Sequence, residues 1–254
     1  MLERVILITG ARSGIGAALA RRLAAPGVGL MLHTRTVDDG HLVDLERVAD
    51  EVRAKGAEVR TGIVDLTIAD AGSRLVAATA AQFGRLDQLV SNAGFAQRGA
   101  FGEVGREALD RSYQAMSGAF FDLTTAALSE LRQAGCGRVV AVSSFVAHRF
   151  DRETPFPVSA AAKAGLEALV RSLAAQLAPD GVTVNAVVPG YTRKDAGGHS
   201  ALAAGAWQRA AALTPLGRIA EPDDVAALIV FLLSPEARHI TGQAIHVDGG
   251  LSLL

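Results

Sequence analysis

The sequence predicts an α/β fold, a doubly wound parallel sheet of about seven strands, from two observations. Apolar runs such as Val5-Ile6-Leu7-Ile8 do not alternate with polar residues, as expected of strands that are buried on both faces of a parallel sheet. Segments with apolar residues at helical spacing separate these runs, the first at residues 17–25. Strands that alternate with helices indicate βαβ units with helices on both faces of the sheet.

The first strand leads into a glycine-rich turn. Thr9 and Gly10 end the strand, and Gly14-Ile15-Gly16 opens a helix that stops at Pro26-Gly27. Glycines let bare backbone approach a pyrophosphate, and the free N–H groups of the helix N-terminus bind it. The order of strand, glycine turn and helix therefore indicates a Rossmann-type nucleotide site. The alternative is that the glycines are present only because the turn needs residues with a positive φ.

The string Thr9-Gly10-Ala11-Arg12-Ser13-Gly14-Ile15-Gly16 resembles the cofactor loop of the short-chain dehydrogenase/reductase family, and matching motifs continue to Gly249-Gly250. The resemblance implies a single Rossmann-type domain over residues 1–254, with a small lid around residues 191–214, and a homotetramer. It also implies that the cofactor contacts this loop through Gly10, Arg12, Ser13, Gly14, Ile15 and Gly16.

Composition narrows the class of protein. Half of the residues are hydrophobic, which is ample for a core, and the net charge of −1 gives no reason to expect a nucleic-acid partner. Cys136 is the single cysteine, and the first strand begins too early for a signal peptide, so a reducing cytoplasm is expected. No apolar run reaches the roughly 18 residues that span a bilayer, and neither a membrane nor a metal site is expected.

A second strand at residues 28–33 is followed by Thr34-Arg35-Thr36. An acidic residue at this strand end would bind the ribose 2′-hydroxyl of NAD, whereas an arginine accommodates the 2′-phosphate of NADP. Arg35 is such an arginine, and Arg12 could add a second positive charge. The sequence therefore favours NADP(H) over NAD(H), with a solvated Arg35 as the alternative.

Two further strand ends carry cofactor motifs. The strand at residues 59–64 ends at Asp65-Leu66, where the family caps the adenine ring, although Asp65 could equally cap the next helix. The strand at residues 86–91 ends in Asn92-Ala93-Gly94, which is similar to the family's Asn-Asn-Ala-Gly element with Ser91 in the first position. The resemblance implies that this element supports the sheet and lines the cofactor ribose.

Ser144 follows the strand at residues 138–143 and matches the family's catalytic serine, which orients a substrate carbonyl. Lys163, within Ala160-Ala161-Ala162-Lys163-Ala164-Gly165, matches the lysine that binds the nicotinamide ribose. A helix is expected at residues 107–134, and the family's water-holding asparagine falls there on Met116. Methionine cannot fulfil that role.

Ser159 stands four residues before Lys163, where the family has the tyrosine that donates a proton to the carbonyl. A serine hydroxyl is shorter and far less acidic than a phenol, so the expected catalytic set of Ser144, Ser159 and Lys163 is atypical. Water or an unidentified group would replace the tyrosine. His148, in the loop before Ser159, could supply a proton, and Tyr191 is a remote candidate.

The strand at residues 182–188 runs into Pro189-Gly190-Tyr191-Thr192, and the resemblance implies that Pro189, Gly190 and Thr192 meet the nicotinamide carboxamide. The fold could bring a group of basic residues to one rim, which would suit an anionic small-molecule substrate. These residues are Arg149, Arg152, Arg193 and Lys194.

The sequence thus predicts an NADP(H)-dependent oxidoreductase that acts on a carbonyl or alcohol. Because the tyrosine and the asparagine are replaced, two alternatives stay open. One is a lyase or isomerase that uses the bound cofactor structurally, and the other is a catalytically silent cofactor-binding protein.

Overall fold

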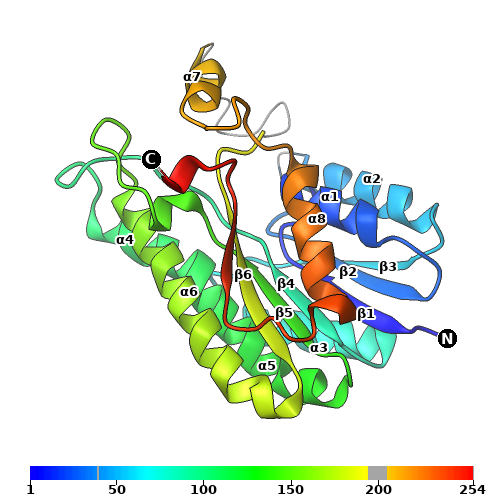
Figure 1. Ribbon diagram of the computed structural model, residues 1–254. Coiled ribbons are helices and arrows are strands. Elements are labelled where there is room, and N and C mark those ends of the chain that lie inside the picture. The colour runs from blue at the N-terminus through cyan, green and yellow to red at the C-terminus, as the bar shows by residue number, and fades with distance from the viewer. Residues whose placement is uncertain (39, 194–204, 254) are drawn as a thin grey trace.

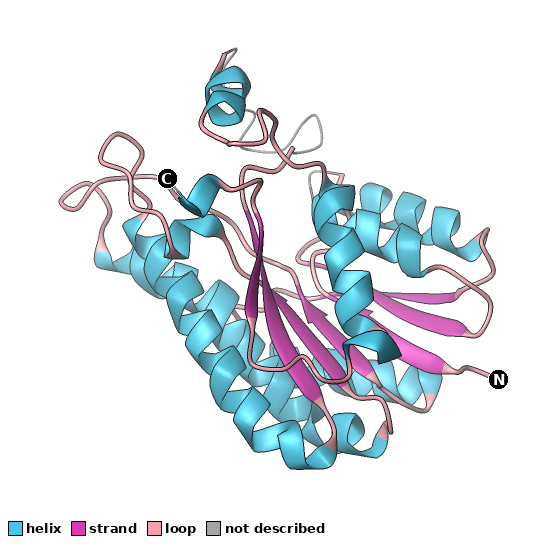
Figure 2. Cartoon of the chain, in the orientation of Figure 1, coloured by secondary structure: helices cyan, strands magenta, loops and turns pink. Residues whose placement is uncertain are grey.

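The structure, a computed structural model, describes residues 1–38, 40–193 and 205–253. These residues form one sheet of seven strands, all paired in parallel, in the order β3-β2-β1-β4-β5-β6-β7 (Figures 1 and 2). The predicted doubly wound α/β fold is confirmed. The strands are β1 (Arg4–Ile8), β2 (Val28–Thr34), β3 (Glu58–Ile63), β4 (Gln88–Ser91), β5 (Arg138–Val142), β6 (Thr183–Pro189) and β7 (Ala244–Val247).

Helices cover both faces of the sheet (Figure 1). Ile6 and Ile8 of β1 belong to a core that is shared with α1 (Gly14–Leu23), α2 (His41–Arg53) and α8 (Pro222–Leu233). The neighbouring residues Val5 and Leu7 point to the other face, where α3 (Ala71–Phe83), α5 (Ala119–Gln133) and α6 (Pro157–Leu177) cover them. This two-sided burial explains why β1 reads as a continuous apolar run.

The helix that was predicted over residues 107–134 is divided. It consists of α4 (Arg106–Tyr113), a π-helical turn (Gln114–Gly118) and α5, so Met116 lies within the π turn. Turns of this kind are rare and often lie at functional sites. Strand β4 begins at Gln88, later than predicted, because the Asp87 carboxylate instead of a backbone carbonyl accepts the Val5 N–H bond at 2.7 Å.

The predicted lid is described only in part. Helix α7 (Ala206–Ala212) contains Trp207, as the sequence predicts, and lies beyond the carboxyl ends of the strands (Figure 1). Residues 194–204, which include Lys194 and the pair Gly197-Gly198, lie outside the described residues. The role of this segment as a lid stays a prediction.

The order of the strands locates the ligand crevice. Strands β1 and β4 are neighbours, and the connections that follow them, α1 and the α4–α5 segment, turn to opposite faces of the sheet. In open α/β sheets ligands bind beyond the carboxyl ends of the strands at this reversal. The glycine turn after β1 and Asn92 after β4 both lie there.

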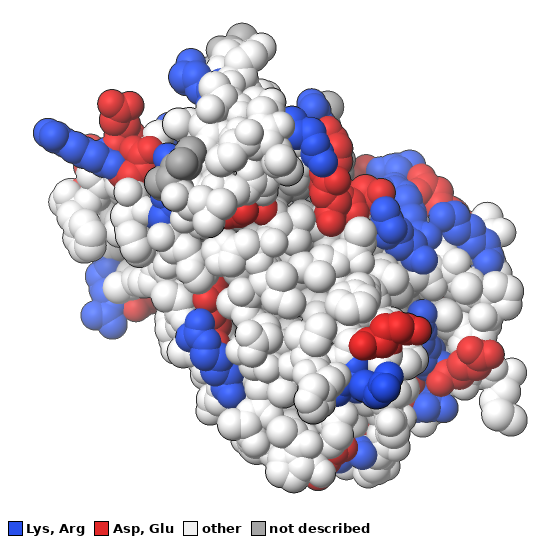
Figure 3. Space-filling model, viewed as in Figure 1, with Lys and Arg blue, Asp and Glu red and all other residues white. Residues whose placement is uncertain are grey.

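Charged side chains of both signs are mixed on the face shown in Figure 3, which also has a broad area without charged residues over β7 and α8. Among the described helices, none has the length and apolar character needed to cross a membrane.

Candidate active site

The glycine turn leaves bare backbone at the start of α1. Gly14 has a φ of 53°, and a Cβ at Gly16 would lie 2.3 Å from the Gly10 carbonyl oxygen, so both positions require glycine. The Ser13 side chain makes no capping hydrogen bond to α1. A glycine turn that leads into a helix N-terminus fits the pyrophosphate of a dinucleotide.

Asn92 joins the loops after β1 and β4. Its side-chain amide donates to the carbonyl oxygens of Thr9 at 2.9 Å and Gly10 at 3.1 Å. In return, the Thr9 hydroxyl accepts the N–H groups of Asn92 at 2.9 Å and Ala93 at 3.0 Å. The structure thus brings Asn92 and Ala93 beside the predicted cofactor turn and fixes the width of the crevice.

His33 supports the same turn, and the sequence analysis missed it. The Gly10 N–H lies 3.4 Å from His33 Nδ1, and His33 Nε2 lies 2.8 Å from the Val64 carbonyl oxygen. Both contacts suit a neutral imidazole that donates from Nε2 and accepts at Nδ1. Burial lowers the pKa of His33, which favours this neutral form. A polar residue inside an otherwise apolar strand was the signal available in the sequence.

The two arginines expected near the adenosine end differ in their surroundings. Arg12 forms an ion pair with Asp44, with 3.3 Å between Nη1 and Oδ2. Arg35, directly after β2, is exposed, and its guanidinium has no ion-pair partner in the described parts of the chain. Arg35 is therefore the guanidinium available to a 2′-phosphate.

Asp65 and Leu66 lie at the end of β3. The Asp65 carboxylate accepts the backbone N–H of Thr67 at 2.9 Å and its hydroxyl at 2.8 Å, so it caps the turn that follows. Leu66 is buried in the core that includes α3. The alternative that Asp65 caps the next helix is wrong, because α3 begins at Ala71 with Asp70 as its N-cap residue. Contact of Asp65 and Leu66 with an adenine ring stays a prediction.

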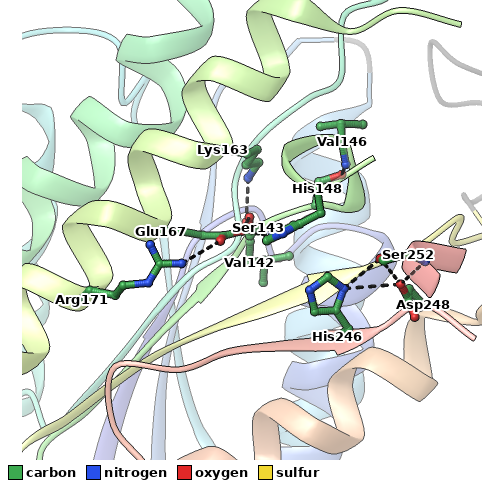
Figure 4. A network of polar contacts seen from close by, with 11 residues as sticks. Val142, Ser143, Val146, His148, Lys163, Glu167, Arg171, His246, Asp248 and Ser252 are labelled. Atoms are coloured by element: carbon green, nitrogen blue, oxygen red, sulfur yellow. Dashed lines mark hydrogen bonds and ion pairs between the residues drawn. The ribbon is translucent and has the colours of Figure 1, made fainter. Parts of the chain in front are cut away.

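Lys163 lies at the centre of the site (Figure 4). Its Nζ donates to the Val142 carbonyl oxygen at 2.6 Å, just before Ser144. Burial lowers the pKa of Lys163 to about 8, although the charge of Glu167 opposes that shift. A Cβ at Gly94 would lie 3.3 Å from Lys163 Nζ and 3.4 Å from Met116 Cγ. The side chains of Met116 and Lys163 therefore both border Gly94.

Ser144 follows β5, and its Oγ accepts only a long hydrogen bond, 3.5 Å, from the Val146 N–H. The hydroxyl is partly exposed and can donate to a ligand. Ser159 is different, because it is 1% exposed and its Oγ accepts the Gln97 N–H at 2.8 Å. The serine at the tyrosine position thus fixes the segment after Gly94 against α6.

Glu167 is a second residue that the sequence analysis missed. Its Oε1 accepts the Ser143 hydroxyl at 2.5 Å and lies 2.8 Å from His148 Nε2 (Figure 4). His148 also packs edge-on against His246, with 4.6 Å between ring centroids. The imidazole that was considered as a proton source is thus paired with a buried carboxylate. An acidic residue on the helix face of Lys163, four residues later, was the signal.

The residues of the predicted basic rim differ in their surroundings, and their gathering at one rim stays a prediction. Arg193 pairs with Glu221, with 2.7 Å between Nε and Oε1, and Lys194 lies outside the described residues. Arg149 donates to the Leu251 carbonyl oxygen at 3.0 Å.

Gly190 and Thr192 continue the chain beyond Pro189 at the end of β6. The Gly190 N–H bonds to the Val247 carbonyl at 3.1 Å, and the Thr192 hydroxyl donates to the Gly190 carbonyl at 3.1 Å. These bonds place the predicted carboxamide contact at the same sheet edge as the other site residues.

Comparison with known proteins identifies the family. A family profile described as enoyl-(acyl carrier protein) reductase matches residues 10–252. The chain is 35% identical to L-rhamnose 1-dehydrogenase (NAD(P)(+)) of Azotobacter vinelandii, over 99% of this chain and 97% of that protein. It is 37% identical to cis-4-hydroxycyclohexanecarboxylate dehydrogenase of Sinomonas cyclohexanicum, over 98% and 96%.

A solved structure agrees with these matches. A single-residue variant of actinorhodin polyketide ketoreductase with NADPH superimposes with a TM-score of 0.87 at 29% identity, over 99% of this chain and 98% of that one. The chain therefore belongs to the short-chain dehydrogenase/reductase family of oxidoreductases, which act on alcohol or carbonyl substrates.

Proposed function

We propose that this protein is an NADP(H)-dependent oxidoreductase that interconverts a small-molecule alcohol and its carbonyl compound. One observation carries the proposal: the glycine turn after β1, Ser144 after β5 and the Lys163 ammonium group at the end of β5 lie along the carboxyl edge of the sheet. This is the edge at which open α/β sheets bind nucleotides and substrates.

The residues at the crevice fit a nicotinamide dinucleotide. Gly10, Ser13, Gly14, Ile15 and Gly16 would hold its pyrophosphate, because a Cβ at Gly14 would point into open space and Gly16 lets the start of α1 pack directly on Gly10. Arg35 would bind the 2′-phosphate, with Arg12 contributing from its pair with Asp44. NAD(P)(+) in the name of the rhamnose dehydrogenase and NADPH in the ketoreductase structure support this class of cofactor.

Further contacts would come from the other strand ends. Asp65 and Leu66 would lie beside the adenine, and Asn92, Ala93 and Gly94 beside the ribose. Pro189, Gly190 and Thr192 would meet the carboxamide.

Residues of the chain would have separate roles in the reaction. A bound nicotinamide would supply or accept the reducing equivalent. The Ser144 hydroxyl donates a hydrogen bond to the substrate carbonyl oxygen, and the Lys163 ammonium group binds ribose hydroxyls and adds positive charge. Ser159 positions the Gln97 segment, so the proton comes from water. A positioned acid contributes about 10²- to 10⁴-fold, so turnover of generic ketones is slow.

The test is a titration of the protein with NADPH and with NADH, followed by cofactor fluorescence. We expect NADPH to bind at least about tenfold tighter, which is roughly 1.4 kcal/mol, and Arg35→Asp to reverse the preference. Arg106→Asp, which changes a distant arginine paired with Asp110, is the matched control. Equal affinities in the parent protein would defeat the proposal for the cofactor.

A silent cofactor-binding protein, or a lyase or isomerase with a structural cofactor, is the second candidate. Two observations favour it: the Ser159 hydroxyl is used by Gln97, and Met116 brings a thioether where the family has an amide. Transfer of deuterium from C4-deuterated NADPH to a product would separate the redox enzyme from this candidate.

We also propose that the chain forms a homotetramer in the cytoplasm. Strand β7 is an edge strand, and the area over β7 and α8 lacks charged side chains (Figure 3). The free thiol of Cys136 suits a reducing compartment. Light scattering in solution would measure the oligomeric state.

A further inference from the structure

Tyr191 lies beside the turn that carries Ser144. It follows Gly190 at the carboxyl end of β6, and its ring packs against Phe145 with 4.7 Å between centroids. Phe145 is the residue after Ser144. The other tyrosine of the chain, Tyr113, belongs to α4. The site that lacks the family's phenol thus has a different phenol at its mouth.

Arg149 approaches Tyr191 from the same turn. Its backbone N–H bonds to the Phe145 carbonyl oxygen at 2.9 Å, and one guanidinium nitrogen donates to the Leu251 carbonyl oxygen at 3.0 Å. A guanidinium has five N–H donors, so most remain for a ligand. Arg149 forms no ion pair within the described ranges.

Arg98 also lies within electrostatic range of Tyr191. It follows Gln97, whose N–H bonds to Ser159, and its guanidinium lies 5.7 Å from the centre of the Phe156 ring. The Gly99 N–H bonds to the Pro155 carbonyl oxygen at 3.1 Å. These contacts position the backbone on both sides of Arg98, so the segment loses little conformational entropy when a ligand binds.

The two guanidinium groups affect the pKa of the Tyr191 phenol. Burial raises the pKa of Tyr191, Arg149 and Arg98 oppose that shift, and Asp151 adds to it. The phenol therefore stays protonated at neutral pH and can donate a hydrogen bond. The Asp151 carboxylate is turned into its own loop, where Oδ1 accepts the backbone N–H of Glu153 at 2.7 Å.

We propose that Arg98, Arg149 and Tyr191 together bind a carboxylate of the substrate. The inference rests on the proposed function and gives its substrate class: an apolar hydroxy acid or oxo acid. The two guanidinium groups present only donors, the protonated phenol can donate one further hydrogen bond, and a carboxylate offers only acceptors. The rings of Phe145 and Phe156, beside these groups, provide apolar contact for the body of such an acid.

The test measures thermal unfolding of the NADPH-saturated protein with matched acids and amides. The pairs are benzoate and benzamide, cyclohexanecarboxylate and its amide, and hexanoate and its amide. We expect at least one acid to raise the Tm more than its amide. Arg98→Met and Arg149→Met should each weaken that acid about tenfold and leave the amide unchanged. If no acid exceeds its amide, the inference is wrong.

Arg111→Met is the matched control, because Arg111 is also exposed and lies 5.7 Å from the centre of a phenyl ring, that of Phe95. An equal loss in this variant would show general charge attraction and overturn the assignment. If Tyr191→Phe lowers kcat and leaves acid affinity unchanged, the phenol acts on the reacting oxygen, and its assignment here is wrong. NADPH affinity is measured first, so failure of cofactor binding is distinguished from failure of the acid site.

Discussion

Replacing Lys163 by methionine should make the protein more stable while it removes the activity. Lys163 is buried, and its pKa is lowered to about 8 from the ordinary value of 10.5. A difference of that size corresponds to about 3 kcal/mol that the folded state loses by keeping the ammonium group charged at neutral pH. Loss of the hydrogen bond to the Val142 carbonyl offsets about 1 kcal/mol. We therefore expect Lys163→Met to gain about 2 kcal/mol near neutral pH.

The pH dependence of this gain gives the sharper test. Between about pH 8 and 10.5 the unfolded chain binds the proton and folded Lys163 releases it, so the parent protein becomes more stable relative to the variant. The stability difference between variant and parent should therefore shrink across that window. Other groups titrate equally in both proteins and cancel.

Urea unfolding of both proteins, at neutral pH and within this alkaline window, measures the difference. Lys55→Met is the control, because Lys55 is exposed and donates to the Arg21 carbonyl oxygen. A Lys163→Met protein that is less stable than the parent at neutral pH, or a difference that does not change with pH, would refute the reasoning.

Three further predictions concern residues around the site. Ser159→Tyr should raise NADPH-dependent turnover of a ketone panel at least about tenfold, because Ser144 and Lys163 already stand at matching positions; a slower variant would show that the chain has its own acid. His33→Phe should weaken NADPH binding, because the Gly10 N–H loses its partner. The parent protein loses stability as the pH falls below about 6.5, because His33 is protonated first in the unfolded chain, and the variant should lack this part of the loss. Urea unfolding near pH 7 and pH 5 measures the effect, and an unchanged acid sensitivity of the variant would contradict the prediction. Glu167→Gln should lower the pKa of Lys163 further and shift the alkaline limb of the pH–rate profile to lower pH; an unmoved limb would count against this coupling.

The local pattern of apolar and polar residues was sufficient to predict the fold and the sheet edge at which the site lies. Each strand of the sheet except the last was placed within a few residues, because burial on both faces produces the same apolar run wherever it occurs. Ser144 and the glycine turn follow strands at a predictable sheet edge. Resemblance to the family added Lys163, which a helix carries to that edge from a distant part of the chain.

Long-range contacts explain what the sequence analysis missed. Nothing near Ser159 in the chain shows that its hydroxyl accepts the Gln97 N–H, 62 residues away. The partner of Arg193 is Glu221, 28 residues later, and nothing near Arg193 in the chain indicates this ion pair. His33 and Glu167 were each visible only as a polar residue on an apolar face, and such a residue shows that a partner is needed without naming it.

The most direct test of the central claim is transfer of deuterium from C4-deuterated NADPH to the product. The protein is incubated with a panel of oxo acids and neutral ketones, and the products are analysed by mass spectrometry. We expect slow but measurable deuterium in an alcohol product, and none with Lys163→Met. Tight binding of NADPH without deuterium in any product would contradict the account and identify a cofactor-binding protein that does not catalyse a redox reaction.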